Sequence, residues 1–477
     1  NDGLGETVAH AIEDHYKPRF AGDALPRNTA GVVVALADKL ETLVGMFGIG
    51  NLPTGDRDPF ALRRHALGVI RMLVEKDLPL NLNALLAGAA PAFGDKITDA
   101  SAQLADFIYD RLAGSLREQG YSAQEVDAVL EQLNLGSIFS LPHRLETEVA
   151  EQLITLIPCA EMFRFGKNGT DATSACIRLS RAVTGQERVA VCGYHGWQDW
   201  YIGSTTRHLG VPECVRELTH RFDYNDLASL KAQLEAHPGE FAAVILEPMN
   251  VAWPTPEFLP GLRQLCDQHG ALLIFDETIT GFRFHLGGAQ TLFGVTPDLA
   301  AFGKGMANGF PISAVVGRRQ YMRRMEDIFF SGTFGGDAIA LAAANAVIGK
   351  MRRLDVPARL ADRGQQLLSG LDALLQKLDA PSWLQSAGHP SWSFLLIGDS
   401  ANHSSWLLKS YFIQELCKRG ILSLGSHNLN LAHSEQDVQT LLAVYAEVLP
   451  ALIRLDADKA IHQALNGEPI QPVFKVR

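Results

Sequence analysis

The chain has 477 residues, of which 47% are hydrophobic and 20% charged, a balance typical of a globular protein with two or three domains. Its 42 Lys and Arg residues are outnumbered by 53 Asp and Glu residues, and the net charge of −11 argues against broad electrostatic binding of nucleic acid or acidic membranes. The six cysteines are scattered and never form a CxxC pair, which argues against a disulfide framework or a zinc site and fits a reducing cytoplasm.

The first part of the chain, up to about residue 133, is predicted to be helical throughout. Apolar residues recur at three- and four-residue spacing in residues 33–43, 60–74 and 104–116. Asp58 is expected to cap the second of these helices, and Pro59 to occupy its first turn, where a missing N–H does no harm. We expect no bilayer-spanning apolar run, and the chain start shows no basic-then-apolar pattern of a signal peptide.

Three segments of this part resemble the β subunit of bacterial glycyl-tRNA synthetase. They are HYKPRFAGDALP, ALADKLETLVGMFGIG and PTGDRDPFALRRHALGVIR, at residues 15–26, 35–50 and 53–71. The resemblance covers about 130 residues, a minority of that subunit, and the family's catalytic core for glycine activation belongs to the other subunit. His15 and Asp38 resemble part of that family's helical HD-type domain, but its metal-binding His-Asp pair is not intact here. We therefore interpret this part as a helical packing module.

From about residue 136 the pattern changes to short apolar runs that alternate with amphipathic helical segments. The runs include residues 242–246, 271–275 and 314–316. This alternation is typical of a parallel-rich sheet with helices on both faces. Because no internal repeat or low-complexity linker separates the two parts, the boundary near residues 133–138 is interpreted as an abrupt join between unrelated pieces.

Two carboxylates, Asp276 and Glu277, follow the apolar run ALLIF in the motif FDETITGFR. They are expected at the carboxyl end of a strand, which is the edge where open α/β sheets bind ligands. A carboxylate there can keep a pyridinium nitrogen protonated and so make a bound pyridoxal ring an electron sink. Metal sites and helix caps carry similar pairs, so the motif alone leaves these alternatives open.

Lys304 lies 28 residues after Asp276, between Gly303 and Gly305, at the end of another apolar run. Glycines on both sides let the backbone and a ligand approach the lysine closely. A lysine in a partly desolvated site has a lowered pKa and can form an imine with an aldehyde. The alternative is a solvated lysine in a glycine-rich turn, and the pairing with Asp276 favours the imine.

A candidate phosphate site follows a short predicted strand, at residues 168–170, where a helix begins. Free backbone N–H groups and the Thr170 hydroxyl would bind the phosphate. An ordinary capped helix, with Thr170 or Asp171 as the cap, is the alternative. Further on, the segment CGYHGWQDW offers Tyr194 or His195 to stack on an aromatic cofactor, unless these rings are simply core residues.

Together these segments resemble the class III aminotransferases, a fold type I pyridoxal-phosphate family, over about residues 138–477. The resemblance implies that Lys304 is the Schiff-base lysine and that Asp276 pairs with the pyridine nitrogen. It further implies the other cofactor contacts, which are Gly169 and Thr170 at the phosphate, Tyr194 and His195 beside the ring, Glu247 and Thr278 near its faces, and Thr333 at the phosphate of a neighbouring subunit. It also implies a homodimer, a small amine and an aldehyde or keto substrate, and no metal.

The expected architecture is therefore α/β of fold type I, preceded by an all-α segment. We expect the helical segment in residues 1–133, the cofactor-binding large domain in residues 136–345 and a small C-terminal domain in residues 346–477. Thr278 departs from the family, which usually places Val or Ile there. Trp197 and Trp200 either line the substrate entrance or pack in a core, and core packing is favoured.

Three hypotheses for the function follow. The first is pyridoxal-phosphate-dependent amino transfer. The second is a 2,1-aminomutase of the glutamate-1-semialdehyde type, although the stretch after residue 196 lacks the expected glycine- and serine-rich gating loop. The third is a non-catalytic fusion with a cofactor-binding remnant, because synthetase-like helices replace the stretch that family members carry before SIFSLPHRLETEVAEQL. Binding of tRNA by the front piece is disfavoured by the chain's acidity.

Overall fold

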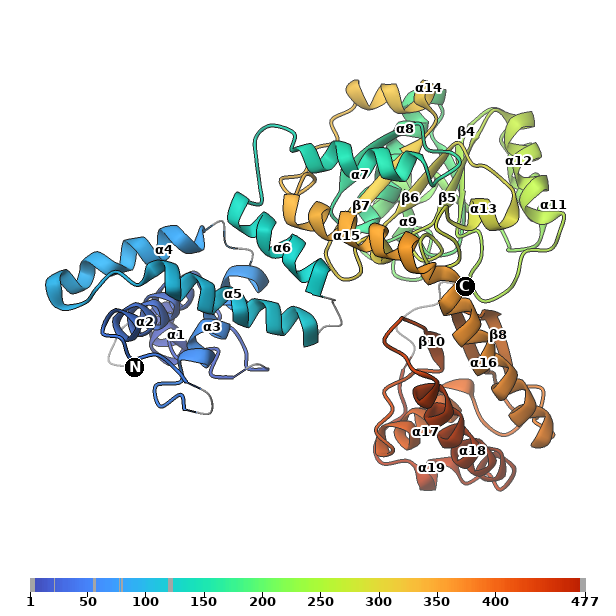
Figure 1. Ribbon diagram of the computed structural model, residues 1–477. Coiled ribbons are helices and arrows are strands. Elements are labelled where there is room, and N and C mark those ends of the chain that lie inside the picture. The colour runs from blue at the N-terminus through green and yellow to red at the C-terminus, as the bar shows by residue number, and fades with distance from the viewer. Residues whose placement is uncertain are drawn as a thin grey trace. The chain divides into compact units, whose positions relative to one another are not determined.

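The computed structural model describes residues 5–20, 22–54, 57–76, 78, 80–118 and 123–471. The chain divides into two compact units, Asn1–Gly136 and Ser137–Arg477, which we call unit 1 and unit 2 (Figure 1). The absence of a signal-peptide pattern was expected partly from residues 1–4, which lie outside the described residues.

Unit 1 is built from helices. In chain order these are α1 (Glu6–Asp14), α2 (Thr29–Gly48), α3 (Leu62–Glu75), α4 (Leu82–Ala89), the 3₁₀ helix η1 (Ala90–Lys96), α5 (Ser101–Glu118) and α6 (Ala123–Leu135). The three predicted helices correspond to α2, α3 and α5. Leu43 of α2, Val69 of α3 and Ile108 of α5 are buried in one shared core.

The start of α3 differs in part from the prediction. Asp58 accepts hydrogen bonds from the N–H groups of Leu62 (2.7 Å) and Arg63 (3.0 Å), so its predicted capping role is confirmed. Pro59, however, precedes the helix, because Ala61 adopts a left-handed conformation (φ 54°) and α3 begins only at Leu62. The carboxylate therefore reaches the helix across a turn.

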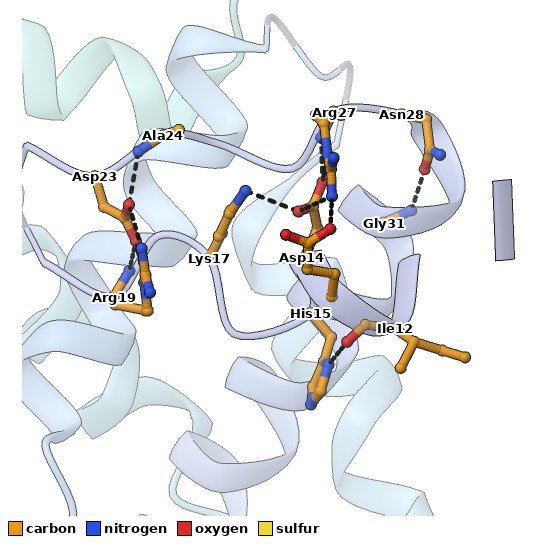
Figure 2. A network of polar contacts seen from close by, with 11 residues as sticks. Ile12, Asp14, His15, Lys17, Arg19, Asp23, Ala24, Arg27, Asn28 and Gly31 are labelled. Carbon is orange, nitrogen blue, oxygen red and sulfur yellow. Dashed lines mark hydrogen bonds and ion pairs between the residues drawn. The ribbon is translucent and has the colours of Figure 1, made fainter. Parts of the chain in front are cut away.

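A network of ion pairs holds the segment between α1 and α2 in unit 1 (Figure 2). Asp14 is fully buried and lies 2.8 Å from Lys17 Nζ and 2.9 Å from Arg27 Nε. The hydrogen bonds from Arg27 hold the pKa of Asp14 well below its usual range. Asp23 is paired with Arg19 in the same way, and that arginine lowers its pKa too. The charges of this network thus compensate one another.

His15 makes a local contact instead of a metal-site contact, because its Nδ1 lies 2.6 Å from the carbonyl oxygen of Ile12 in the helix it ends (Figure 2). Among the described residues, no group of three or more His, Cys, Asp and Glu side chains could hold a metal ion.

Unit 2 contains a seven-stranded sheet in the order β1-β7-β6-β5-β4-β2-β3. The strands are β1 (Met162–Gly166), β2 (Arg188–Cys192), β3 (Thr219–Arg221), β4 (Phe241–Leu246), β5 (Leu272–Asp276), β6 (Leu299–Phe302) and β7 (Ser313–Gly317). The five adjacent strands β6, β5, β4, β2 and β3 are parallel, whereas β7 runs antiparallel to both β6 and β1. The predicted runs form β4, β5 and β7, and the expected parallel-rich sheet is confirmed.

Helices cover both faces of this sheet. The unit's helices before the small sheet are α7 (Arg144–Ile154), α8 (Gly169–Thr184), α9 (Asp199–Ile202), α10 (Glu213–Arg216), α11 (Leu227–Ala236), α12 (Phe258–His269), α13 (Ala289–Phe293), η2 (Lys304–Met306), α14 (Arg319–Met322), η3 (Arg323–Glu326), α15 (Ala338–Leu354) and α16 (Val356–Lys377). Alternate residues of β4 pack to opposite sides. Val244 joins a core with α7, α11, α12 and α15, and Ile245 joins a core with α8.

The C-terminal part has a three-stranded antiparallel sheet in the order β10-β9-β8. Its elements are β8 (Leu384–His389), β9 (Trp392–Ile397), α17 (Ser405–Lys418), β10 (Ser426–Asn428), α18 (Glu435–Ala457) and α19 (Ile461–Ala464). The predicted boundary between residues 345 and 346 falls within α15, because that helix continues to Leu354 before the chain turns at Asp355 (φ 48°) into α16. A division at this turn therefore fits the helices better.

One helix among the described residues, α18, is long and apolar enough to cross a membrane by length and composition alone, contrary to the expectation from sequence. It packs against α16 and α17 and buries Val444, Tyr445, Val448 and Leu452 along one side. Since a core helix passes the same test, this length and composition are weak evidence for a membrane span.

Candidate active site

Lys304 lies at the carboxyl end of β6, where the strand turns into η2. Its backbone is left-handed (φ 41°), a conformation that costs a non-glycine residue about 1–3 kcal/mol and that is concentrated at functional sites. Its side chain is exposed and lines a cavity of about 340 Å³. The lysine is thus held at the sheet edge with its amine accessible.

Asp276 ends β5, the neighbouring strand, and its side chain is buried. Its Oδ2 lies 2.9 Å from Nδ1 of His195, and its Oδ1 accepts hydrogen bonds from the N–H (3.1 Å) and hydroxyl (2.5 Å) of Thr278. His195 follows β2, and because β2, β4 and β5 are parallel, residues after their carboxyl ends meet at one edge. A carboxylate accepts only, so His195 Nδ1 carries the shared hydrogen.

Two buried polar atoms that belong to predicted site residues at this edge have no hydrogen-bond partner within the described part of the chain. They are Nε2 of His195 and Oγ1 of Thr170. The loop beside them is closely fitted, since Gly196 has a φ of 105° and an added Cβ would lie 2.3 Å from the Thr170 hydroxyl oxygen. Buried polar atoms are normally paired, so these two fit a site that a polar ligand completes.

The start of α8 resolves the alternative left open for Thr170. Asn168 is the N-cap residue and forms a capping box with Asp171, which accepts the Asn168 N–H at 2.7 Å, so Thr170 is not part of the cap. Gly169 and Thr170 are the first residues of the helix, and the first N–H groups of a helix have no partner within it. These groups and the Thr170 hydroxyl fit a phosphate.

Glu247 fixes the loop that carries Tyr194. Its Oε2 accepts the N–H of Tyr194 at 3.0 Å, and its Oε1 accepts a hydrogen bond from Asn250 at 2.9 Å. The buried carboxylate lies directly under Gly193, which has a φ of 108° and whose added Cβ would lie 2.6 Å from Glu247 Oε2. The Tyr194 ring is 40% exposed and meets the Tyr201 ring edge-on.

Glu277, the second carboxylate of the strand-end pair, has a structural environment. It is fully buried and accepts hydrogen bonds from the Thr280 hydroxyl, the N–H groups of Ala289 and Gln290, and the Gln290 amide. Burial nevertheless raises its pKa. These contacts tie β5 to α13, so the two adjacent carboxylates have different surroundings and Asp276 alone meets His195.

Three further predicted residues have varied surroundings. Thr333 is exposed in the segment between η3 and α15, which is compatible with a contact outside this chain. Trp200 is buried and donates a hydrogen bond to the Ser174 hydroxyl at 2.9 Å, so core packing is confirmed for it. Trp197 is 67% exposed, and for this residue the favoured core packing is wrong.

The cavity beside Lys304 is lined by residues that sequence reasoning missed. They include Arg283, Trp392, Phe394, Ser426 and Asn428, and of the predicted site residues Lys304 alone contributes to this lining. Arg283 closes the FDETITGFR motif, which was the only available signal. The others come from β9 and β10, and only the folded chain brings them to β6.

Fold and site together define an α/β transferase of the pyridoxal-phosphate type, with a lysine and a buried carboxylate on neighbouring strand ends. Residues 108–432 match the family model described as "Aminotransferase class-III", and the chain belongs to that family, whose membership implies pyridoxal phosphate as the cofactor. Residues 1–131 match the model described as "Glycyl-tRNA synthetase beta subunit". The matches overlap in residues 108–131, which belong to unit 1.

Relatives match the two units separately. The glycine–tRNA ligase β subunit of Acidovorax sp. (strain JS42) is 82% identical over 146 residues, which are 31% of this chain and 20% of that protein. The chain thus spans about a fifth of the length of such relatives. The 3-aminobutyryl-CoA aminotransferase of Cloacimonas acidaminovorans is 36% identical over 331 residues, 67% of this chain and 78% of that protein.

A solved structure supports the fold of unit 2. The FumI protein of Sphingopyxis sp. MTA144, solved in a form with pyridoxal phosphate, has a TM-score of 0.65 and 29% sequence identity. The match covers 70% of this chain and 82% of that one. The sheet and site geometry described above therefore belong to a fold known to hold this cofactor.

Proposed function

We propose that this protein transfers an amino group between an amine or amino acid and an aldehyde or keto substrate, with Lys304 as the Schiff-base lysine. The observation that carries the proposal is the placement of Lys304 and the Asp276–His195 pair on neighbouring strand ends of one sheet edge. Among the described residues, the Thr170 hydroxyl and His195 Nε2 have no hydrogen-bond partner, and this supports a polar cofactor at the site.

When bound, pyridoxal phosphate supplies an electron sink for the substrate's reacting carbon. Asp276, oriented by His195 and Thr278, would hold the proton on the ring nitrogen. Gly169 and Thr170 would bind the phosphate. Tyr194 and Thr278 would contact the two faces of the ring, and Glu247 would lie beneath the Tyr194 loop. Thr333 would reach the phosphate of a neighbouring subunit. Lys304 would then move a proton at the substrate carbon as general base and acid.

Amino transfer is favoured over the 2,1-aminomutase reaction by one comparison. The relative that matches two thirds of this chain is named an aminotransferase, and it acts on 3-aminobutyryl-CoA by that name. The match leaves about a fifth of that relative's length without a counterpart in this chain. A non-catalytic fusion is therefore one outcome of the test below.

We also propose a homodimer and a cytoplasmic location. The exposed Thr333 segment supports the dimer, since a residue that reaches a neighbouring subunit must lie at the surface. All six cysteines are free, which fits a reducing compartment. Nucleic acid and membrane are not proposed as partners.

The test is the visible absorbance of the purified full chain with pyridoxal phosphate, before and after a panel of amines. We expect the parent to show a visible absorbance band that is absent in Lys304→Ala. The same variant should react with amines at least about 10³-fold more slowly than the parent. Lys377→Ala, which removes an exposed lysine of α16, should change neither. A stable lysine-dependent band that no amine alters would instead identify the non-catalytic fusion, and no such band would refute the proposal.

A further inference from the structure

Arg283 is a partly buried cation without a carboxylate partner. Its Nη1 donates hydrogen bonds to the carbonyl oxygens of Ser391 (3.0 Å) and Leu429 (2.9 Å), and no ion pair with Asp or Glu is found for it among the described residues. Arg263, by contrast, is paired with both Asp298 and Asp267. A buried charge without a counter-charge is unfavourable, and burial indeed lowers the pKa of Arg283.

The two carbonyl contacts leave the rest of the guanidinium free for a ligand. Arginine has five N–H donors, and the two on Nη1 are directed to Ser391 and Leu429. The three on Nε and Nη2 remain, and this pair of nitrogens forms the fork that binds a carboxylate through two parallel hydrogen bonds. Arg283 lines the same cavity as Lys304. The cavity thus contains the proposed Schiff-base lysine and an anion-binding group.

Polar groups from β10 add to this wall because of the strand's alternation. His427 is buried, with Nδ1 2.9 Å from the Ser393 hydroxyl and Nε2 2.8 Å from the Tyr445 hydroxyl. Its neighbours Ser426 and Asn428 therefore point to the opposite face, and both line the cavity. The exposed Asn428 amide makes no hydrogen bond with the described residues. Its N–H groups are free to donate to a carboxylate.

The remaining walls and the size of the cavity limit the substrate. Trp392 and Phe394 of β9 and Ile279 give the cavity an apolar side. Its volume of about 340 Å³ is near the lower end of the range for small-molecule sites. A short aliphatic or aromatic group would fit this side, whereas a long extension would have to leave the cavity.

We propose that Arg283, with Asn428 and Ser426, binds the free carboxylate of a small amino acid whose amine would replace the amine of Lys304 on the bound cofactor, and that Trp392 and Phe394 contact its apolar substituent. This inference rests on the proposed amino transfer. It assigns a free acid, and not a thioester or a simple amine, as the preferred amino donor.

The experiment compares three donors of nearly equal size with the cofactor-loaded chain: 3-aminobutanoate, 3-aminobutanamide and sec-butylamine. The spectral half-reaction should be at least about 10²-fold more efficient with the acid, as expected for a charge-paired contact in a desolvated site. Arg283→Gln should reduce the acid to the level of the amide and leave the other two within about threefold. Arg359→Gln, which removes an exposed arginine of α16, is the matched control.

Two further variants guard against misfolding of Arg283→Gln, whose side chain also contacts two carbonyls. Arg283→Lys keeps the charge and should retain part of the preference for the acid. Asn428→Ala removes a side chain without described hydrogen bonds and should weaken the acid alone, by about tenfold. Equal reactivity of the parent with all three donors, or equal loss of all three in Arg283→Gln, would overturn the inference and leave amino transfer standing.

A binding measurement separates this inference from the proposed function. Butanoate and butanamide are titrated calorimetrically into the parent and the Arg283 variants, without any amine reaction. Butanoate binding that requires Arg283 supports the carboxylate site even if no amine reacts. Failure of butanoate to bind the parent would refute it, whatever the reactivity of Lys304.

Discussion

Each unit contains a buried or partly buried cation that has no carboxylate partner among the described residues, and the two cations differ in what lies beside them. Lys39 of α2 is 2% exposed, and its Nζ donates to the carbonyl oxygen of Tyr16 at 3.2 Å. Its stem fills the space above Gly68, where an added Cβ would lie 2.6 Å from Lys39 Cε. Arg283 instead lines a cavity. An unpaired cation therefore points to a ligand only where accessible space adjoins it.

The same contrast extends to sequence similarity. Unit 1 matches its relatives at 82% identity but spans a fifth of their length, and its charged groups mostly pair with one another. Unit 2 matches at 36% identity but covers 78% of a relative, and it has a site with unpartnered polar atoms. High identity over a short share thus says less about activity here than moderate identity over most of a relative's length.

The largest effect that distinguishes the two units is expected when Asp276, the buried carboxylate at the candidate site of unit 2, is replaced. Asp276→Asn should lower the rate of amine reaction by roughly 10²–10³-fold, because a neutral amide no longer stabilises a proton on the ring nitrogen. The visible band should persist, since Lys304 is intact. Asp362→Asn, at an exposed position of α16, is the control, and an unchanged rate in Asp276→Asn would show that Asp276 is not part of the chemistry.

Next in size is a pH effect on the stability of unit 2. Burial lowers the pKa of His427 to about 4, so the folded protein keeps it neutral while the unfolded chain takes up a proton below about pH 6.5. Its contribution is complete above pH 6.5 and is lost as pH falls toward 4, by up to about 3 kcal/mol.

Tryptophan fluorescence during urea unfolding measures this effect, because all six tryptophans belong to unit 2. His427→Gln should flatten the pH dependence of the free energy of unfolding between pH 6.5 and 4. His433→Gln, an exposed histidine near β10, should leave that dependence as in the parent. An equal slope in the parent and His427→Gln would assign the effect to other groups.

In unit 1, Asp14→Asn should lower the free energy of unfolding by about 2 kcal/mol, because it leaves Lys17 and Arg27 without their buried partner. Far-UV circular dichroism would report the transition, while tryptophan fluorescence and amine reactivity should not change. Glu13→Gln removes the exposed partner of Arg27 and should have less than about 0.5 kcal/mol of effect. Loss of amine reactivity in Asp14→Asn would show that the units are coupled.

The smallest effect is expected from Lys39→Met, which removes the buried ammonium group of unit 1. Methionine has a similar length, and removal of a desolvated charge should raise the free energy of unfolding of unit 1 by about 1 kcal/mol. The direction follows from the pKa of Lys39, which burial lowers. Destabilisation, measured by circular dichroism, would show that the ammonium group is needed and that Lys39 differs less from Arg283 than the surroundings indicate.

The sequence was sufficient to predict local positions that one continuous segment determines. Lys304 and Asp276 each follow an apolar run, and both lie at strand ends as predicted. The contact between His195 and Asp276 joins residues 81 positions apart and depends on the order of β2, β4 and β5. The acceptors of Arg283 lie 108 and 146 positions away. Such pairings follow from strand order, which local patterns do not encode.

Local errors had local causes. Pro59 was expected inside α3, and the left-handed Ala61 moved the start of the helix. Trp197 and Trp200 were indistinguishable by sequence, although one is exposed and the other is buried against α8.

One backbone hydrogen bond holds the first residue of unit 2 in place. The carbonyl oxygen of Ser137, the first residue of this unit, accepts a hydrogen bond from the N–H of Ala338 at the start of α15. The polypeptide that leads into β1 and α8 is therefore anchored before it reaches the sheet. Exchange of the segment in front of Ser137 would leave this hydrogen bond in place, so the start of unit 2 does not depend on the sequence of the helices before it.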